Sequence, residues 1–336
     1  MSEVNSSTGS RGGWTSDGIA TAAQLACLLE VSAPKPGNVS PGRAFRDMAF
    51  EDFLASAAAI AVPMQRAGGC SLGATIRAAV EATGRWTSAN TNLGMVLLLA
   101  PLVRAANRVI AVEGRLAGEA ADGAPDGIDP AVLRTYVAHV VDEATVADAR
   151  DVFAAIRRVA PGGLGQAPAQ DVADEPTLPL KEIMTLAAHR DDVAREYATG
   201  FGTTFELAVP ALLAARESGL GWNDAIVETF LAVLATRHDT HVRRRGGDAL
   251  AADLSRRAAE ALAAGGVRTE GGRRTIEQMD AALRAPDNLT NPGTTADLTA
   301  AAIFVVLLST PGLNEAGRVP LDPAGVRERK RDATTR

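Results

Sequence analysis

Apolar residues recur at helical spacing along most of the 336-residue chain. From about Ser16 onward, alanine, leucine, isoleucine, valine and phenylalanine return every three or four residues, which places them on one face of a helix. No segment alternates apolar and polar residues as a convincing β-strand would. The pattern therefore predicts an all-α protein. The predicted stripes are Ile19–Leu29, Phe53–Met64 with a kink at Pro63, Ala149–Ala160, Phe205–Leu213, Ile226–Leu234 and a final run that ends at Leu308.

Two segments rich in glycine, alanine, aspartate or proline interrupt the helices, residues 114–130 and 161–179. Polar motifs lie on both sides of these segments, so a site would be assembled from distant parts of the chain. We therefore predict one large helical domain over residues 16–316, with the two segments as loop excursions. Residues 1–15 are expected to form a disordered tail, and residues 317–336 a charged tail.

Composition supports the helical prediction and narrows the function. Aromatic residues make up only 4% of the chain, whereas strands favour aromatic and β-branched side chains. The net charge is −6, which provides no broad basic surface for a nucleic-acid backbone. The longest apolar runs, 93–103 and 300–308, are shorter than the roughly 20 residues of a membrane span, and the N-terminus lacks the apolar core of a secretion signal. We expect a cytoplasmic protein that binds neither nucleic acid nor membrane.

Three short polar segments beside predicted helices carry much of the candidate chemistry. Each combines glycine or proline with asparagine, threonine or a charged residue, a mixture that can aim backbone donors and short polar side chains into a cleft. They predict a buried polar cleft built from loops at helix ends. The segments are Pro34–Val39, Ala89–Gly94 and Asn291–Leu298.

The first segment follows a predicted helix that ends at Glu30. Its prolines fix the backbone and Gly37 permits close backbone approach, so Lys35 and Asn38 would project from a stiff loop. A lysine in that position suits a phosphate oxygen. The alternative is that the turn residues only end the helix, and the motif alone gives the two interpretations equal weight.

The other two segments place more polar groups at helix starts than capping requires. Asn90, Thr91 and Asn92 precede a strongly apolar helix, and one N-cap needs only one of them, which favours a ligand site. Gly293 precedes a helix start that can accept an anion, but Asp297 would repel that anion. A carboxylate, a phosphate and Mg²⁺ together would resolve the conflict.

The densest polar run of the chain supplies the remaining candidates. Asp239 with His241 could form a metal or acid–base pair. The following residues Arg243, Arg244 and Arg245 could hold a triphosphate. The alternative is a solvated helix end in which arginines face the helix dipole.

These segments together resemble the triphosphoribosyl-dephospho-CoA synthase family, whose members make the precursor of the citrate lyase and malonate decarboxylase prosthetic group. The matching segments follow the family's order, while Phe45–Arg46 replaces its usual histidine and Thr294–Thr295 replaces a Gly-Ser-like pair, as in a divergent member. They are Glu30 with Pro34–Gly37, Asp47–Met48 with Phe53 and Ser56–Ala57, Asn90–Gly94, Asp239–Gly247, and Pro292–Leu298.

The resemblance implies an ATP-using transferase. A ribose hydroxyl of dephospho-CoA, or of a related acceptor, would displace adenine from C1 of the ATP ribose and take over the triphosphoribosyl group. The implied nucleotide-binding residues are Lys35, Gly37, Asn38, Asn90, Thr91, Asn92, Arg243, Arg244, Arg245 and Gly293; the implied Mg²⁺ ligands are Asp47, Asp239 and Asp297; the implied catalytic residues are Asp239, Asp297 and Glu30.

Two other functions remain open from the residues. A Mg²⁺-dependent N-glycosidic hydrolase of the nucleosidase or ADP-ribosyl type would break the same kind of bond with water. A non-catalytic nucleotide-binding paralogue would bind ATP without turnover, and the replaced histidine favours that interpretation. The sequence does not decide whether the chain forms a homo-oligomer.

Overall fold

The computed structural model describes residues 13–117, 127–284 and 289–310, without the side chains of residues 113–117. In these ranges the chain forms helices joined by loops, with two isolated β-bridges and no strand, so the all-α prediction is confirmed. The helices are α1 (Ser16–Ser32), α2 (Phe50–Ala59), α3 (Ala61–Gln65), η1 (Ala67–Gly69), α4 (Leu72–Thr83), α5 (Leu93–Ala117), α6 (Pro130–Asp142), α7 (Val146–Val159), α8 (Leu180–Ala187), α9 (Asp192–Thr199), η2 (Thr204–Ala208), α10 (Val209–Glu217), α11 (Trp222–Thr236), α12 (Thr240–Gly246), α13 (Asp248–Ala263), η3 (Gly266–Arg268), α14 (Glu270–Ala282) and α15 (Gly293–Ser309).

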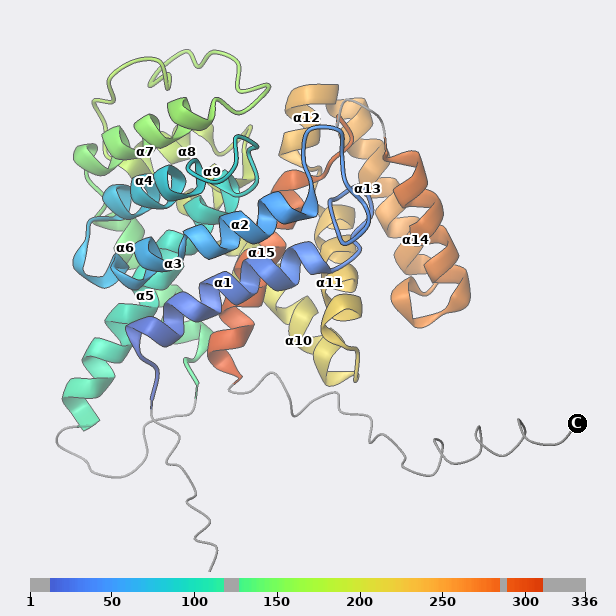
Figure 1. The fold of residues 1–336 in the computed structure, drawn as a ribbon, viewed down its shortest axis with the longest axis horizontal. Helices are drawn as coiled ribbons and strands as arrows, with labels where there is room; N and C mark the ends of the chain where they lie inside the picture. The colour runs from blue at the N-terminus through green and yellow to red at the C-terminus, as the bar shows by residue number, and fades with distance from the viewer. Residues whose placement is uncertain (1–12, 118–126, 285–288, 311–336) are drawn as a thin grey trace, which may run out of the picture.

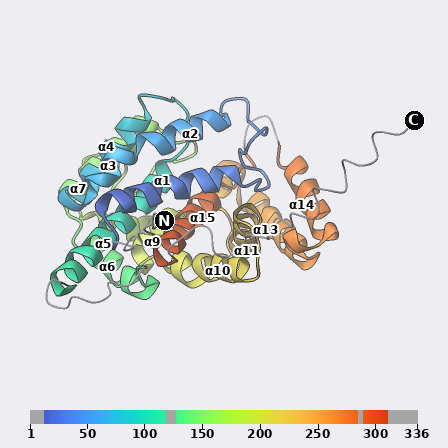
Figure 2. The ribbon, with the colours of Figure 1, turned by 60° about the horizontal axis from the view of Figure 1, so that its bottom comes forward.

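Helix α15 lies at the centre of the fold. Every side chain from Thr294 to Leu308 is buried except Asp297, which is half-buried. This burial follows from a sequence that is apolar on all sides, so the helix is enclosed by α1, α5, α10 and α11. Figures 1 and 2 show α2 to α9 mainly on one side of α15 and α10 to α14 on the other.

Helix α5 is longer than the apolar run at 93–103 suggested. By length and composition its segment Leu93–Val112 could cross a membrane, but 72% of this apolar stretch is buried inside the fold. Such burial is typical of a core helix. Since α5 continues to Ala117 and α6 begins at Pro130, the predicted excursion 114–130 starts inside a helix. Its residues 118–126, and most of the predicted tails 1–15 and 317–336, lie outside the described residues.

The predicted helix Phe53–Met64 is interrupted earlier than expected. Helix α2 ends at Ala59 and α3 begins at Ala61, so the break falls at Ile60 rather than at Pro63. A proline ring blocks the carbonyl four residues before it, here that of Ala59, which explains the position of the break.

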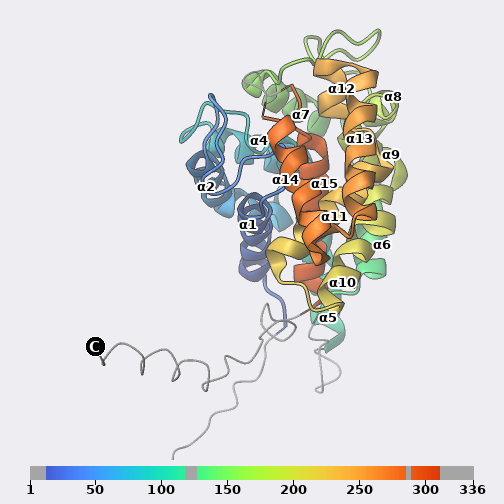
Figure 3. The same cartoon turned by 90° about the vertical axis from the view of Figure 1, so that its right-hand side faces the viewer.

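The polar loops meet at the end of the fold where α15 begins. The loop between α1 and α2, the loop between α4 and α5, the long loop between α7 and α8, and the short helix α12 all gather there (Figures 1 and 3). The long connection runs from Ala160 to Pro179 without a helix. Segments far apart in the sequence thus form one surface around the first turns of α15.

Candidate functional site

Two adjoining pockets lie at this end of the fold. One, called here the polar pocket, has a lining that is half polar and a volume of about 460 Å³; the other, the apolar pocket, has a mostly apolar lining and a volume of about 410 Å³. Because several residues line both, one ligand can extend from the first pocket into the second. The shared residues are Asn90, Leu93, Gly94, His241 and Asp297.

The polar pocket is formed by the loops that the sequence motifs predicted. Besides the shared residues, its wall includes Glu30 at the end of α1, Asn38 and Asp47 from the following loop, and Arg245 from α12. Asn291 and Gly293 close it at the start of α15. Three carboxyl groups, amides and one guanidinium thus face the same space.

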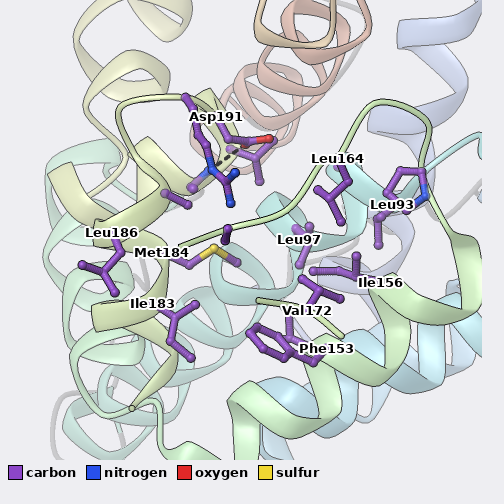
Figure 4. Close-up of a pocket in the computed structure, with 18 of the residues that line it drawn as sticks. Leu93, Leu97, Phe153, Ile156, Leu164, Val172, Ile183, Met184, Leu186 and Asp191 are labelled. Atoms are coloured by element: carbon purple, nitrogen blue, oxygen red, sulfur yellow. Dashed lines mark hydrogen bonds between the residues drawn. The ribbon is translucent and has the colours of Figure 1, made fainter. Parts of the chain in front are cut away.

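The apolar pocket lies on the other side of the junction (Figure 4). Its walls come from α5, α7, α8 and α9, and the loop between α7 and α8 covers it. Such a surface suits the apolar part of a ligand rather than a phosphate. Side chains seen around it in Figure 4 include Leu97, Phe153, Ile156, Leu164, Val172 and Ile183.

Asp297 stands at the junction, one turn into α15. Gly94 lies opposite, and a Cβ added to it would stand 1.9 Å from Asp297 Oδ2, so glycine leaves room for the carboxyl group. Burial, followed by the negative charges of Glu30, Asp239 and Asp191, raises the pKa of Asp297 well above the usual aspartate range. A carboxyl group with a raised pKa that faces two pockets can exchange a proton with a ligand.

Asp239 lies close to the same helix start but lines neither pocket. It is the N-cap of α12, where Oδ1 accepts a hydrogen bond from the Val242 N–H at 3.0 Å. Its Oδ2 accepts from the N–H and the hydroxyl of Thr295, both at 2.7 Å. The structure therefore does not place Asp239 as a metal ligand or catalytic group, because its oxygens join α12 to α15 instead.

Lys35 points inward rather than projecting from its loop as predicted. Its side chain is fully buried, and its ammonium lies 3.0 Å from Glu30 Oε1 and donates to the Ala33 carbonyl at 3.1 Å. Burial lowers the pKa of Lys35 and raises that of Glu30, while the pairing opposes both shifts. Lys35 thus holds Glu30 at the wall of the polar pocket, and it does not reach a phosphate there.

The rest of this loop is fixed by the α14 region. Gly37 has a φ of 74°, which favours glycine, and its N–H donates to Asp280 at 2.9 Å. Arg284 donates to the carbonyl of Asn38 at 2.7 Å. Asn38 lines the polar pocket, but Gly37 lines neither pocket, so the glycine shapes the loop.

The three polar residues before α5 have different surroundings. Thr91 forms a hydrogen bond with Ser56, and Asn92 donates to Thr83 Oγ1 at 3.0 Å, both in buried positions. All three line the polar pocket, but only Asn90, which is exposed, also lines the apolar pocket. Of the three, the side chain of Asn90 is therefore the best placed to contact a ligand.

The three arginines of α12 point in different directions. Arg243 donates to the carbonyl of His189 at 3.0 Å and lines neither pocket. Arg244 binds Asp191 at 2.5 Å in the wall of the apolar pocket. Arg245 alone of the three lines the polar pocket. The predicted clamp of three arginines is thus reduced to one.

His241 lines both pockets and contacts Arg245 rather than Asp239, with 3.4 Å between His241 Nε2 and Arg245 Nη1. Burial, and then the charges of Arg244 and Arg245, lower its pKa to about 4. The imidazole is therefore neutral at physiological pH. It offers hydrogen bonds at the junction without a positive charge.

The predicted metal ligands Asp47, Asp239 and Asp297 do not come together. Within the described part of the chain, no three histidine, cysteine, aspartate or glutamate side chains are grouped closely enough to hold a metal ion. Asp47 and Asp297 do line the same polar pocket. Because Mg²⁺ commonly uses one or two carboxylates and takes its other ligands from phosphates and water, these two residues fit a site shared with a nucleotide.

Sequence reasoning missed the apolar pocket. The apolar residues Leu164 and Val172 inside the otherwise polar segment 161–179 were a signal that this loop covers something. It also gave no role to Asn291, which lines the polar pocket and whose buried Oδ1 has no hydrogen-bond partner among the described residues.

A family model described as CitG, ATP:dephospho-CoA triphosphoribosyl transferase, matches residues 16–315. The chain belongs to this family. The matched range includes every residue that lines either pocket. The family that the five sequence segments suggested is therefore confirmed.

Individual relatives agree with the family. The chain is 31% identical over 147 residues to a probable 2-(5''-triphosphoribosyl)-3'-dephosphocoenzyme-A synthase of Pseudomonas savastanoi pv. phaseolicola, covering 41% of this chain and 50% of the relative. It is 35% identical over 113 residues to the synthase of that name from Klebsiella pneumoniae, covering 33% of this chain and 40% of the relative. The matched segments thus span half or less of these relatives.

A solved structure matches more of the chain. It is described as a triphosphoribosyl-dephospho-coA synthase from Archaeoglobus fulgidus, with 26% identity and a TM-score of 0.57. The superposition covers 77% of this chain and 98% of the other. The helical arrangement described above is thus shared with that protein over nearly its whole length.

Proposed function

We propose that the protein transfers the 5-triphosphoribosyl group of ATP to a ribose hydroxyl of dephospho-CoA or a related nucleotide and releases adenine. The observation that carries this proposal is the family match over residues 16–315, which spans both pockets. We expect the enzyme to act in the cytoplasm, where ATP is available.

The reaction makes one bond and breaks one at C1 of the ATP ribose. The acceptor oxygen bonds to C1, the bond from C1 to the purine nitrogen breaks, and its electron pair leaves with adenine. The hydroxyl loses a proton and the departing base gains one. We assign Asp297 as the base that takes the hydroxyl proton, because its carboxyl group is at the junction and no described residue donates a hydrogen bond to it.

Other residues of the polar pocket would bind and orient the nucleotide. Arg245 supplies positive charge for the triphosphate, and Asn90 and His241 supply hydrogen bonds at the junction. Asp47 would hold Mg²⁺ together with substrate phosphates and water, and the ion would neutralise phosphate charge, while Asp297 takes the proton. Glu30, fixed by Lys35, keeps a second carboxyl group beside Asp297.

The direct test is incubation with ATP, Mg²⁺ and dephospho-CoA, followed by chromatography and mass spectrometry. We expect adenine and the triphosphoribosylated acceptor in equal amounts. Adenine released without the acceptor would instead support an N-glycosidic hydrolase. Release of ADP or phosphate, or tight ATP binding without turnover, would contradict the transferase proposal.

A further inference from the structure

We propose that the apolar pocket is the purine subsite for ATP, with the ribose at the junction and the triphosphate in the polar pocket. This inference rests on the proposed function, but its test does not require turnover. It assigns a role to the loop between α7 and α8, to which neither the family match nor the sequence motifs give one.

The first argument is the connectivity of ATP. The purine is attached at C1 of the ribose and the triphosphate at C5, so the two groups extend from opposite ends of the sugar. The two pockets likewise extend in different directions from Asn90, Gly94 and Asp297. A ribose bound at these shared residues therefore sends one substituent into each pocket, and places C1 near the Asp297 carboxyl group.

The second argument is the chemistry of the walls. A triphosphate in the apolar pocket would lose hydration against side chains such as Leu97, Phe153 and Ile156, at a large cost in free energy. Two arginines stand in the wall of the apolar pocket, Arg190 and Arg244, and Arg244 is paired with Asp191 at 2.5 Å. In the polar pocket, Arg245 and Asn38 face the ligand space. With Mg²⁺ to offset the carboxyl groups of that pocket, the triphosphate lies beside Arg245, which leaves the apolar pocket for the base.

The third argument concerns the alternative occupant, the pantetheine arm of the acceptor. In dephospho-CoA the reacting hydroxyl is on the ribose, and the arm follows a diphosphate attached at C5. To fill the apolar pocket with this arm, the acceptor would have to place its diphosphate between the junction and the apolar walls. The purine of ATP is instead one covalent bond from the reacting carbon.

The loop that covers the pocket is held in place by its own contacts. Arg157 donates to the carbonyl of Val172 at 2.7 Å, the Gln170 amide is paired with Thr177, and the Ala167 N–H donates to Asp171 at 2.5 Å. Ala167 lines the pocket, so a larger side chain there would fill it. Its neighbour on the loop, Ala173, is exposed and lines neither pocket.

The experiment measures binding by calorimetry with three separate probes: adenine, inorganic tripolyphosphate with Mg²⁺, and pantetheine. For Ala167→Phe we expect adenine affinity to fall by about tenfold or more, with tripolyphosphate affinity unchanged. For Arg245→Gln we expect the reverse. Ala173→Phe is the matched control and should bind all three probes like the parent protein.

Several results would overturn the inference. These are no measurable adenine binding, competition between adenine and tripolyphosphate for one site, or an Ala167→Phe variant that loses pantetheine binding but keeps adenine binding.

Steady-state assays separate failure of the purine assignment from failure of the proposed function. If Ala167→Phe raised the KM for dephospho-CoA and left that for ATP unchanged, the transferase would stand and the purine assignment would fail. If ATP bound across both pockets but no transfer occurred, the purine assignment would stand and the transferase would fail.

Discussion

Two aspartates lie beside the first turns of α15, and their surroundings differ. Asp239 is 1% exposed and accepts three hydrogen bonds, from Val242 and Thr295. Asp297 accepts none from the described residues and faces two pockets. Burial raises the pKa of both, but hydrogen bonds oppose the shift in Asp239, whereas neighbouring carboxyl groups add to it in Asp297.

This difference in hydrogen bonding determines which of the two carboxyl groups is available to react. An aspartate whose oxygens already accept backbone and hydroxyl hydrogen bonds has little capacity left for a metal or a proton. One that is held near other carboxyl groups and open to a ligand retains that capacity. Both aspartates lie within the range that the family model matches, so it is their hydrogen-bond partners that distinguish them.

The largest expected effect is that of Asp297→Asn on turnover. The amide keeps the size of the side chain but cannot accept the hydroxyl proton, so kcat should fall by about 10² to 10⁴-fold. The free energy of unfolding should hold or rise, because the substitution removes a charge that is costly to bury. Adenine release and urea unfolding measure the two quantities. Near-normal turnover would show that Asp297 is not the base.

The second effect is that of Gly94→Ala, which displaces the Asp297 carboxyl group without removing it. The new Cβ would stand 1.9 Å from Oδ2, so the side chain must rotate. Since misplacing a reacting group by about 1 Å can cost roughly 10²-fold, kcat should fall by a similar factor. Stability should hold or rise, because alanine is the better helix former in α5.

A matched control for Gly94→Ala is Gly73→Ala in α4. Its Cβ would lie 2.5 Å from the Cα of Asp148, which is backbone and cannot rotate away. We expect this variant to lose stability, with turnover per folded molecule unchanged. If Gly94→Ala also lost mainly stability, the proposed contact between Gly94 and the catalytic carboxyl group would be contradicted.

Much of this architecture follows from the sequence. Helices that bury one face carry a period that is visible without the structure, and the apolar run of α15 identifies a core helix. The predicted kink at Pro63 was placed too late, because a proline disrupts the hydrogen bond to the carbonyl four residues before it, and the break falls at Ile60. Helix α5 extends beyond the apolar run at 93–103 because its polar residues, such as Arg104 and Asn107, find partners inside the fold.

The site could be predicted only in part. Asn38, Asn90 and Asp297 lie at the pocket walls as the motifs suggested, but their roles stay predictions. The inward turn of Lys35 could not be read from its motif, because a loop that projects and one that folds back share the same turn residues. Likewise, the hydrogen bonds that occupy the carboxyl oxygens of Asp239 come in part from Thr295, a residue of a helix distant in the sequence.

The third effect is that of Lys35→Met on stability. It tests the carboxyl group of Glu30, which has fewer partners than that of Asp239 and more than that of Asp297. Glu30 has one strong partner, and removing it leaves a buried, uncompensated charge. We expect a loss of about 3 to 5 kcal/mol in the free energy of unfolding. The KM for ATP should change little in the folded fraction. A large rise in that KM with unchanged stability would instead restore Lys35 as a phosphate ligand.

The fourth effect is that of Asp239→Asn on stability. One oxygen becomes an NH₂ group that faces donors from either Val242 or Thr295, so at least one hydrogen bond is lost. The cost should be about 1 to 3 kcal/mol in the free energy of unfolding. Turnover per folded molecule should remain close to that of the parent protein. A loss of kcat as large as that of Asp297→Asn, in a stable protein, would contradict the structural role.

The smallest effect is a shift in the pH dependence of kcat/KM. A base must be ionised, so activity should fall as the pH drops through the raised pKa of Asp297, at a higher pH than an ordinary aspartate would give. Glu30 is the first charge that raises this pKa, ahead of Asp239 and Asp191, while Arg244 lowers it. Glu30→Gln should therefore move the acid limb to lower pH, by up to about one unit.

A control for this shift is His241→Gln. The imidazole, with a pKa of about 4, is already neutral over the range where the Asp297 limb is expected, so the variant should leave the position of that limb unchanged. If activity instead rose as the pH dropped through the limb, Asp297 would act as the acid that protonates adenine. If the acid limb shifted in His241→Gln but not in Glu30→Gln, Asp297 would not be the group that transfers the proton. The proposed difference between Asp297 and Asp239 would then fail.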